Sequence, residues 1–341
     1  MNNYWERRAA REMYRAMKKP EEIARQLMRL YIAAANRTAG ELDHVFDRYK
    51  QATGLSEDEA KELLEKIDSY DMSDVLEELK KNPKNAELVQ KFEAAAYKHR
   101  LNVLAQTYMD ISSMLRSIAS AADKSFEHML EDISDRAYYH SIFEIQKRTG
   151  VGYSFRMLTP EKITNILERN WTSENYSDRI WNNTAKLAEK VKYVITKKLL
   201  TGGTLHEVTQ EIQQEFASGY YQTRRLARTE ANYAANQLQL QAYKESDIEK
   251  YRYIATLDLR TSKICRSLDN KVFEVAKAEA GKNYPPMHPF CRSTTIAYIP
   301  DDWLKDMTRS AIDPKTGRRI KIPASMNYED WYKKYVKRSK S

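Results

Sequence analysis

The chain has 341 residues, a net charge of +9, only nine glycines and 31% charged residues. Scarce glycine argues against a loop-rich all-β fold, and the high charge indicates helices with much solvated surface. No apolar run approaches the roughly 18 residues that a membrane-spanning helix needs, so we expect no membrane partner. The first residues lack the apolar core of a secretion signal, and the two cysteines favour a reducing compartment.

Residues 1–150 are predicted to form a helical region. Apolar residues, among them Leu27, Leu30 and Ala34, recur at helical spacing. Ser56 and Glu59 have the spacing of a capping box, which satisfies free amides at the start of a helix. The long stretch after residue 83 is nearly free of helix breakers and predicts one or two long helices, and the glycines near residue 150 indicate a hinge.

A second region, residues 151–300, begins with further helices that extend to about residue 248. Thr159 before Pro160 is typical of a helix start, and Thr204 with Glu207 has the spacing of another capping box. The pattern then changes, because KYRYIATLD alternates as a strand does and Asp269-Asn270 indicates a hairpin turn. The predicted fold class is therefore mainly α, with a small β region at residues 250–300.

The last predicted region is a basic tail, residues 301–341. From Arg309 onward it contains ten Lys or Arg against three Asp or Glu, a net charge of +7. Its aromatic residues from Tyr328 to Tyr335 recur at helical spacing, which favours their docking on protein. The interleaved cations would remain for DNA phosphates; these candidates are Lys333, Lys334, Lys337, Arg338 and Lys340. A solubilising tail without a partner would have the same charge.

The corner NYPPMHPFCR, residues 283–292, has three interpretations. Cys265, His288 and Cys291 are side chains that bind zinc, and sheet pairing could bring them together. Structural zinc usually has four ligands, however, and Ser262 stands where a C-x-x-C pair would place the fourth; Asp258 or Asp269 could complete the set.

The second interpretation is a nucleophilic Cys–His pair, which would also need an orienting third group. The third is a rigid corner whose His and Cys are packing groups. We expect the third, and therefore no bound metal ion, no cofactor and no catalytic residue.

Three stretches resemble a known family. They are ARTEANYAANQ at 227–237, LDLRTSKICRSLDNKVFEV at 257–275 and NYPPMHPFCRSTTIAYIP at 283–300. Together they resemble the phage head morphogenesis family, the Mu F-like minor capsid proteins of tailed bacteriophages. NYWERRAAR and GLSEDEAKELL are similar to the helical region that precedes the module in longer members, so the resemblance covers about residues 3–300. Many relatives have C-x-x-C where this chain has Ser262 and Cys265.

The resemblance implies a set of module-defining residues that are structural and not catalytic. They are Arg228, Thr229, Glu230, Asp258, Arg260, Thr261, Cys265, Asp269, His288, Cys291 and Arg292. If Glu230 or Asp258 is buried, it needs a cationic or hydrogen-bonding partner. Arg228, Arg260 and Arg292 are available for that role.

The resemblance also implies a function. The protein would be a non-enzymatic minor head protein, made in the host cytoplasm and packaged inside the virion. Its expected partners are the portal protein, the scaffold or major capsid protein, and double-stranded DNA bound without regard to sequence.

Two alternatives remain open: a nucleic-acid-binding protein unrelated to phage, and an enzyme with a Cys/His site in the C-terminal module. Mu F-like modules can precede toxin or protease domains, but the residues after Pro300 are too few for a further catalytic domain.

Overall fold

The computed structural model describes residues 4–46, 54–149, 152, 155, 157–167, 174–298, 308–314, 316–323 and 326–336. The chain forms two compact units, each assembled from separate segments. Unit 1 comprises Met1–Ile23, Ser125–Tyr176 and Arg224–Ser341, and unit 2 comprises Ala24–Lys124 and Ser177–Thr223. Three long helices contribute residues to both units: α1 (Tyr4–Phe46), α5 (Ala95–Thr149) and α8 (Leu205–Glu245).

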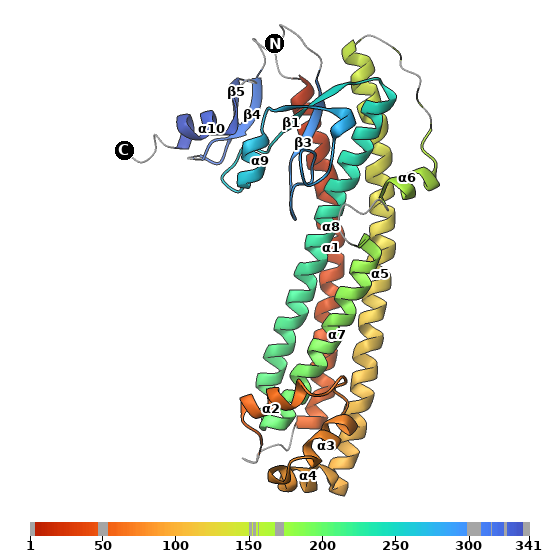
Figure 1. Ribbon diagram of the computed structural model, residues 1–341, viewed down its shortest axis with the longest axis vertical. Helices are drawn as coiled ribbons and strands as arrows, with labels where there is room; N and C mark the ends of the chain where they lie inside the picture. Colours follow the sequence, from red (N-terminus) through yellow and green to blue (C-terminus); the bar gives the residue numbers. More distant parts are fainter. Residues whose placement is uncertain are drawn as a thin grey trace. The chain divides into compact units, whose positions relative to one another are not determined.

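Unit 2 is helical throughout its described part. Parts of α1, α5 and α8 run side by side with α7 (Tyr176–Thr201), and three short helices lie at one end of the unit (Figure 1). These are α2 (Glu57–Leu64), α3 (Met72–Lys80) and α4 (Ala86–Glu93), with the 3-10 turn η1 (Pro83–Asn85) before α4. The helices share one apolar core, in which Ile111, Ile195 and Phe216 are almost completely buried.

Local signals in the sequence explain where these helices begin. Ser56 Oγ accepts a hydrogen bond from Glu59 N, and the Glu59 carboxylate accepts one from Ser56 N, so the predicted capping box is confirmed. The box at Thr204 and Glu207 is likewise confirmed at the start of α8. The breaker-free stretch after residue 83, predicted as one or two long helices, forms the short helix α4 and the long helix α5.

Glycine allows a close helix approach inside unit 2. A Cβ atom at Gly219 of α8 would lie 2.6 Å from Leu187 Cδ2 and 3.2 Å from Tyr31 Cε1. Both distances are shorter than ordinary van der Waals contacts between carbon atoms. The missing side chain therefore allows α8 to pack tightly on its neighbours.

Unit 1 contains a three-stranded antiparallel sheet in the order β2–β1–β3. Its strands are β1 (Lys250–Ile254), β2 (Val272–Glu274) and β3 (Thr294–Ala297). In the register Tyr251 pairs with Phe273 on one side and with Ala297 on the other. Apolar residues of the α8 end, among them Leu240 and Tyr243, pack with Tyr251 and Tyr284 of the sheet region. The short helix α6 (Pro160–Leu167) contributes Ile166 to a second cluster with Tyr138 of α5.

The predicted hairpin at Asp269-Asn270 is wrong. The helix α9 (Lys263–Leu268) precedes these residues, and β2 after them pairs with β1. Ser262 starts α9, because its Oγ accepts a hydrogen bond from Cys265 N at 3.2 Å. Asn270, with φ of 62°, then turns the chain from α9 into β2, which continues into the 3-10 turn η2 (Val275–Lys277).

The described part of the tail is folded. A hairpin is formed by β4 (Thr308–Ile312) and β5 (Arg319–Pro323), followed by α10 (Tyr328–Trp331) and the π-helical turn η4 (Tyr332–Val336). Tyr328 and Trp331 are buried against Leu257, Ala311 and Ile322. The aromatic residues thus pack on protein, as their spacing predicts, and the surface that they cover belongs to the same chain.

The predicted fold class is confirmed: the protein is mainly α, with long helices and a small strand-containing C-terminal region. No helix in the described ranges is both long and apolar enough to cross a membrane. The domain boundaries placed after residues 150 and 300 stay predictions.

Candidate functional site

The Pro-His-Cys corner lies between the sheet and α8. Phe290 adopts φ of 60°, a left-handed conformation that is unfavourable for a bulky residue, so its surroundings must hold it in place. Phe290 N donates a hydrogen bond to Thr229 Oγ1 at 3.2 Å, and the Arg228 guanidinium lies 5.5 Å from the centre of the Phe290 ring. The Arg-Thr pair of α8 therefore anchors the corner, which gives both residues a structural role.

The corner brings the three predicted Cys/His residues together. Cys265 Sγ of α9 lies 3.4 Å from His288 Nε2 and 3.8 Å from Cys291 Sγ. All three candidate ligand atoms lie within 4.8 Å of one another. Both cysteines are free thiols, both are buried, and His288 is half-buried.

Hydrogen bonds fix the orientation of these side chains. His288 Nδ1 lies 2.7 Å from Pro289 O, and because a carbonyl oxygen only accepts, Nδ1 carries the proton. The Nε2 atom is thereby directed at the thiols. Tyr253 of β1 donates from its hydroxyl to Cys265 Sγ at 3.3 Å.

The two thiols differ in acidity. A hydrogen bond with Cys291 lowers the pKa of Cys265 to about 3, against the opposing effect of burial and with the help of His288. A hydrogen bond with Cys265, together with burial, raises the pKa of Cys291 well above its ordinary value. The pKa of His288 is raised, mainly because Cys265 accepts its hydrogen bond. The cluster therefore favours one thiolate, held by a neighbouring thiol and imidazole.

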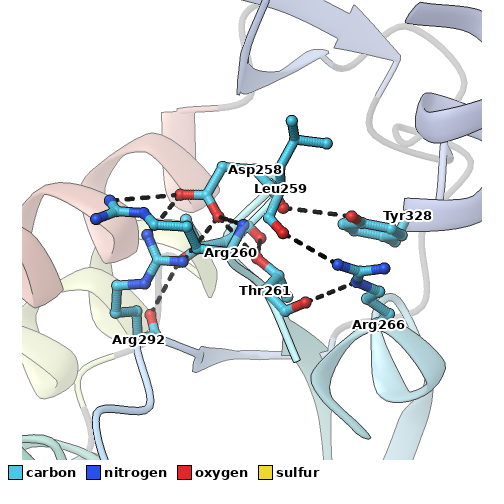
Figure 2. Close-up of polar contacts among 8 residues, drawn as sticks. Asp258, Leu259, Arg260, Thr261, Arg266, Arg292 and Tyr328 are labelled. Carbon is cyan, nitrogen blue, oxygen red and sulfur yellow. Dashed lines mark hydrogen bonds and ion pairs between the residues drawn. The ribbon is translucent and has the colours of Figure 1, made fainter. Parts of the chain in front are cut away.

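A second cluster surrounds Asp258 at the end of β1. The Arg292 guanidinium forms two hydrogen bonds with the Asp258 carboxylate, at 2.5 and 2.7 Å (Figure 2). The carboxylate also accepts from Arg260 N at 2.9 Å. Burial opposes ionisation, but the hydrogen bonds and charge of Arg292 outweigh it, so the pKa of Asp258 lies below its usual value. Of the three arginines proposed as partners, Arg292 makes the hydrogen-bonded ion pair with Asp258, and Arg260 lies farther away, at 3.8 Å.

The same cluster fastens the loop that leads into α9. Thr261 Oγ1 donates to Asp258 Oδ1 at 3.2 Å and also to Thr256 O. Arg266 of α9 donates to Thr261 O at 2.6 Å and to Leu259 O at 3.1 Å (Figure 2). The Tyr328 hydroxyl of α10 donates a hydrogen bond to Asp258 O. The Arg266 guanidinium lies over the Tyr328 ring, 4.5 Å from its centre. The tail thus contacts the Asp258 cluster through Tyr328.

The remaining module residues have other partners. Asp269 Oδ1 accepts from Ala255 N at 2.9 Å, which holds the end of α9 against β1. Arg228 pairs with Glu21 of α1, as does Arg224. Glu230 is buried, whereas Arg260 is exposed and lies 3.8 Å from Asp258.

A buried polar network that the sequence analysis did not select joins α8 to the sheet. Asn232 and Asn236 both donate from their side-chain amides to Ser293 O, at 3.1 and 3.4 Å. Tyr284 donates from its hydroxyl to Asn236 O at 2.8 Å. The asparagines lie in the stretch NYAANQ. Two asparagines at helical spacing on a mostly apolar helix face could have indicated buried side chains that need hydrogen-bond partners.

Residues 189–296 match the family described as "Phage Mu protein F like protein". This segment contains α8, the sheet, the Cys–His cluster and the Asp258 cluster. The chain is similar to this family over that segment, which we call the Mu F-like module. The resemblance read from the sequence motifs is thereby confirmed over these residues, and the family connects the chain to phage head morphogenesis.

A curated relative shares more of the chain. The NAD(+)--arginine ADP-ribosyltransferase EFV of Enterococcus faecalis is 22% identical over 285 residues. The match covers 79% of this chain and 56% of that protein, so the chain spans about half the length of the curated relative that it matches. No solved structure matches the chain.

An ion cluster beside the Mu F-like module was also missed by the sequence analysis. It surrounds a cavity of about 180 Å3 lined by α1, α5, α8 and β3 within unit 1. Arg136 donates to Glu12 at 2.5 Å, and Arg8 pairs with Glu144 at the same distance. Burial raises the pKa of Glu144 and lowers that of His140 between them. These partners are more than 120 residues apart, and a single sequence gives no signal for their pairing.

The proposed DNA-binding cations lie outside the Mu F-like module. Lys333 and Lys334 are exposed on η4, and Arg318, Arg319 and Lys321 are exposed around β5. Lys337, Arg338 and Lys340 lie outside the described residues. The described part of the tail therefore presents cations to solvent, whereas Tyr328 and Trp331 are buried.

Proposed function

We propose that this protein is a minor head protein of a tailed bacteriophage, that it associates with the portal inside the capsid, and that it contacts the packaged DNA. The observation that carries this proposal is the Mu F-like module at residues 189–296. The Cys–His and Asp258 clusters of the module make mostly internal contacts, which supports a structural role. In this proposal the protein is no enzyme, and it is made in the host cytoplasm before packaging.

Portal binding is assigned to the helical region. Unit 2 exposes several large apolar side chains, among them Ile32 with 51% and Met109 with 60% exposure. Exposed apolar side chains gain free energy when a partner covers them. Any contact with scaffold or major capsid protein is assigned to the same region.

Substitutions on the surface test portal binding better than a deletion does. Removing residues 1–150 would expose both cores, because α1 and α5 contribute to each unit. We therefore propose Ile32→Glu with Met109→Glu in unit 2, and Phe143→Glu, at a 55% exposed position of unit 1, as the matched control. Co-expression with the portal should give co-purification of the wild type and the control but not of the double variant. Equal recovery of all three would refute this assignment.

DNA contact is assigned to the exposed cations of the tail. Each phosphate that a cation neutralises releases counterions, so binding should ignore sequence and weaken steeply with salt. Tyr328 and Trp331 are buried and Tyr332 and Tyr335 are partly buried, which favours phosphate contact over stacking on bases.

A salt series measures this contact. We expect Lys333→Gln with Lys334→Gln to lower duplex affinity and to reduce the slope of log affinity against log salt by about 0.9 per lost phosphate contact. Lys84→Gln with Lys98→Gln removes the same charge from exposed positions of unit 2 and serves as the control. Equal slopes for both variants would reject the tail as the DNA contact.

The curated relative favours a second candidate function, arginine ADP-ribosylation. Because 44% of that protein lies outside the match, the named activity need not reside in the shared part. The assay is transfer of labelled ADP-ribose from NAD to an arginine-containing acceptor by the full-length protein. We expect no transfer, and stoichiometric labelling would replace the head-protein proposal.

A further inference from the structure

We propose that Cys265, His288 and Cys291 bind one zinc ion, with the fourth coordination position open to water beside Ser262. This proposal does not depend on the head-protein function. Our expectation from the sequence was that these side chains are packing groups, because only three ligands could be identified. The structure adds their geometry, which the sequence did not contain.

Two of the three distances between these groups match a zinc tetrahedron. With Zn–S bonds of about 2.3 Å and Zn–N bonds of about 2.0 Å, tetrahedral angles place two sulfurs about 3.8 Å apart and a sulfur and a nitrogen about 3.5 Å apart. The observed separations are 3.8 Å between the Sγ atoms of the cysteines and 3.4 Å between Cys265 Sγ and His288 Nε2. The third pair, His288 Nε2 and Cys291 Sγ, lies within 4.8 Å, so these two atoms would move closer together to reach the tetrahedral separation of about 3.5 Å.

The surrounding contacts are those of a ligand set and not of inert packing. A zinc-binding histidine usually donates its other ring N–H to a carbonyl or carboxylate, which fixes the ring and leaves one nitrogen for the metal. His288 does so, since Nδ1 donates to Pro289 O while Nε2 faces the thiols. Tyr253 donates to Cys265 Sγ, a contact that supports a metal-bound thiolate.

The backbone around the ligands is also fixed. Cys265 lies in the first turn of α9, where Ser262 caps its amide, and Cys291 N donates to His288 O at 3.1 Å. The loop carrying His288 and Cys291 is held to α8 through Phe290 and Thr229. Zinc binding would connect α9 directly to the corner.

Ser262 provides the sharpest test. It precedes Cys265 by three residues, the spacing of a zinc-binding C-x-x-C pair, and it is partly exposed beside the cluster. Ser262→Cys should therefore complete a Cys₃His set. Ser267→Cys adds one thiol at an exposed position of the same helix and is the matched control.

The experiment uses the full-length protein, reduced and then equilibrated with Zn²⁺ alone. Elemental analysis after gel filtration should find about one zinc per chain in the wild type, and Co²⁺ in its place should give the visible absorption of a tetrahedral thiolate site. Competition with a chromophoric chelator should show zinc binding at least about tenfold tighter for Ser262→Cys, since a direct ligand should contribute at least as much as an outer-shell contact. Ser267→Cys should leave the affinity unchanged.

Several results would overturn the proposal. One is wild-type protein that holds almost no zinc after equilibration and melts at the same temperature with and without Zn²⁺. Another is the same gain in affinity from Ser267→Cys as from Ser262→Cys, which would indicate adventitious binding to any thiol. A zinc-free wild type with a Cys265–Cys291 disulfide, seen by mass spectrometry in the unreduced protein, would assign the pair to redox chemistry instead.

Discussion

Unit 2 and the Mu F-like sheet of unit 1 are stabilised in different ways. The core of unit 2 is a continuous set of apolar side chains from α1, α5, α7, α8 and the short helices. The sheet region buries many polar side chains, including Asn232, Asn236, Asp269 and Thr295. A buried polar group is costly unless its hydrogen bonds are made. The stability of the sheet region therefore depends on satisfied hydrogen bonds, whereas that of unit 2 depends on close packing of apolar side chains.

This difference predicts how each region responds to substitution. Apolar cores tolerate swaps that conserve volume and lose stability when atoms are removed. Polar networks respond to the loss of one partner even when volume is kept, because the other partner stays buried and unsatisfied. The predictions below test that contrast, from the largest expected effect to the smallest.

The largest effect is expected in the core of unit 2. Phe216 is 2% exposed, and its ring packs edge-on against Tyr31 at a centroid distance of 6.5 Å. Phe216→Ala should reduce the free energy of unfolding by about 3–5 kcal/mol. Hydrogen exchange of α7 and α8 amides measures the loss in this unit, and Tyr221→Ala, at a 52% exposed position, is the control. Equal losses for both variants would contradict the assigned core.

The next effect concerns the Asp258 cluster. Arg292→Met keeps most of the side-chain volume but removes the two hydrogen bonds that the half-buried Asp258 carboxylate accepts, and only the exposed Arg260 remains nearby, at a cost of about 2 kcal/mol. Adding Asp258→Asn should restore part of the loss, because the uncompensated charge is removed. Hydrogen exchange in β1 and β3 measures both variants. A double variant that is less stable than Arg292→Met would argue against a charge-based penalty.

Acid should weaken the same cluster. The pKa of Asp258 is lowered in the folded chain because Arg292 outweighs burial. The stability that ionised Asp258 contributes to the folded chain is therefore fully present above the pKa of Asp258 in the unfolded chain, about 3.9. This contribution is lost as the pH falls through the pKa of Asp258 in the folded chain. Exchange protection of the sheet, measured from pH 5 down to pH 3, should fall more steeply in the wild type than in Asp258→Asn. Parallel curves would exclude Asp258 as the group responsible.

The smallest effect is a lost helix cap in unit 2. Ser56→Ala removes the side chain that accepts from Glu59 N at the start of α2, which should cost about 1 kcal/mol. Increased amide exchange should be confined to α2. Ser56→Asn keeps a capping acceptor and should behave like the wild type, so an equal loss in both variants would show that the cap contributes little.

Local features of the fold could be predicted from the sequence. The capping boxes, the long helix α5 and the strand β1 depend on residues a few positions apart, and all are found. The six-residue helix α9 has too few turns to show periodicity, so the Asp269-Asn270 turn was assigned to a hairpin. The β4–β5 hairpin was likewise hidden in a stretch that reads as a run of charge.

The Cys–His and Asp258 clusters could likewise be predicted only in part from the sequence. The Cys/His residues could be selected by type, and Asp258 could be expected to need an arginine, but three arginines were equally available. Arg228 pairs instead with Glu21, 207 residues away, and a single sequence does not determine such a partner. The zinc proposal likewise depends on interatomic distances that residue types and spacing do not provide.

The most direct test of the central claim is the location of the protein in phage particles. Virions induced from a lysogen that carries this gene should be purified, treated with protease, and analysed by quantitative mass spectrometry before and after the capsid is opened. The account predicts that the protein is present with the portal, protected in intact particles and degraded once they are opened. Absence from purified particles, or complete degradation on intact ones, would contradict a head protein inside the capsid.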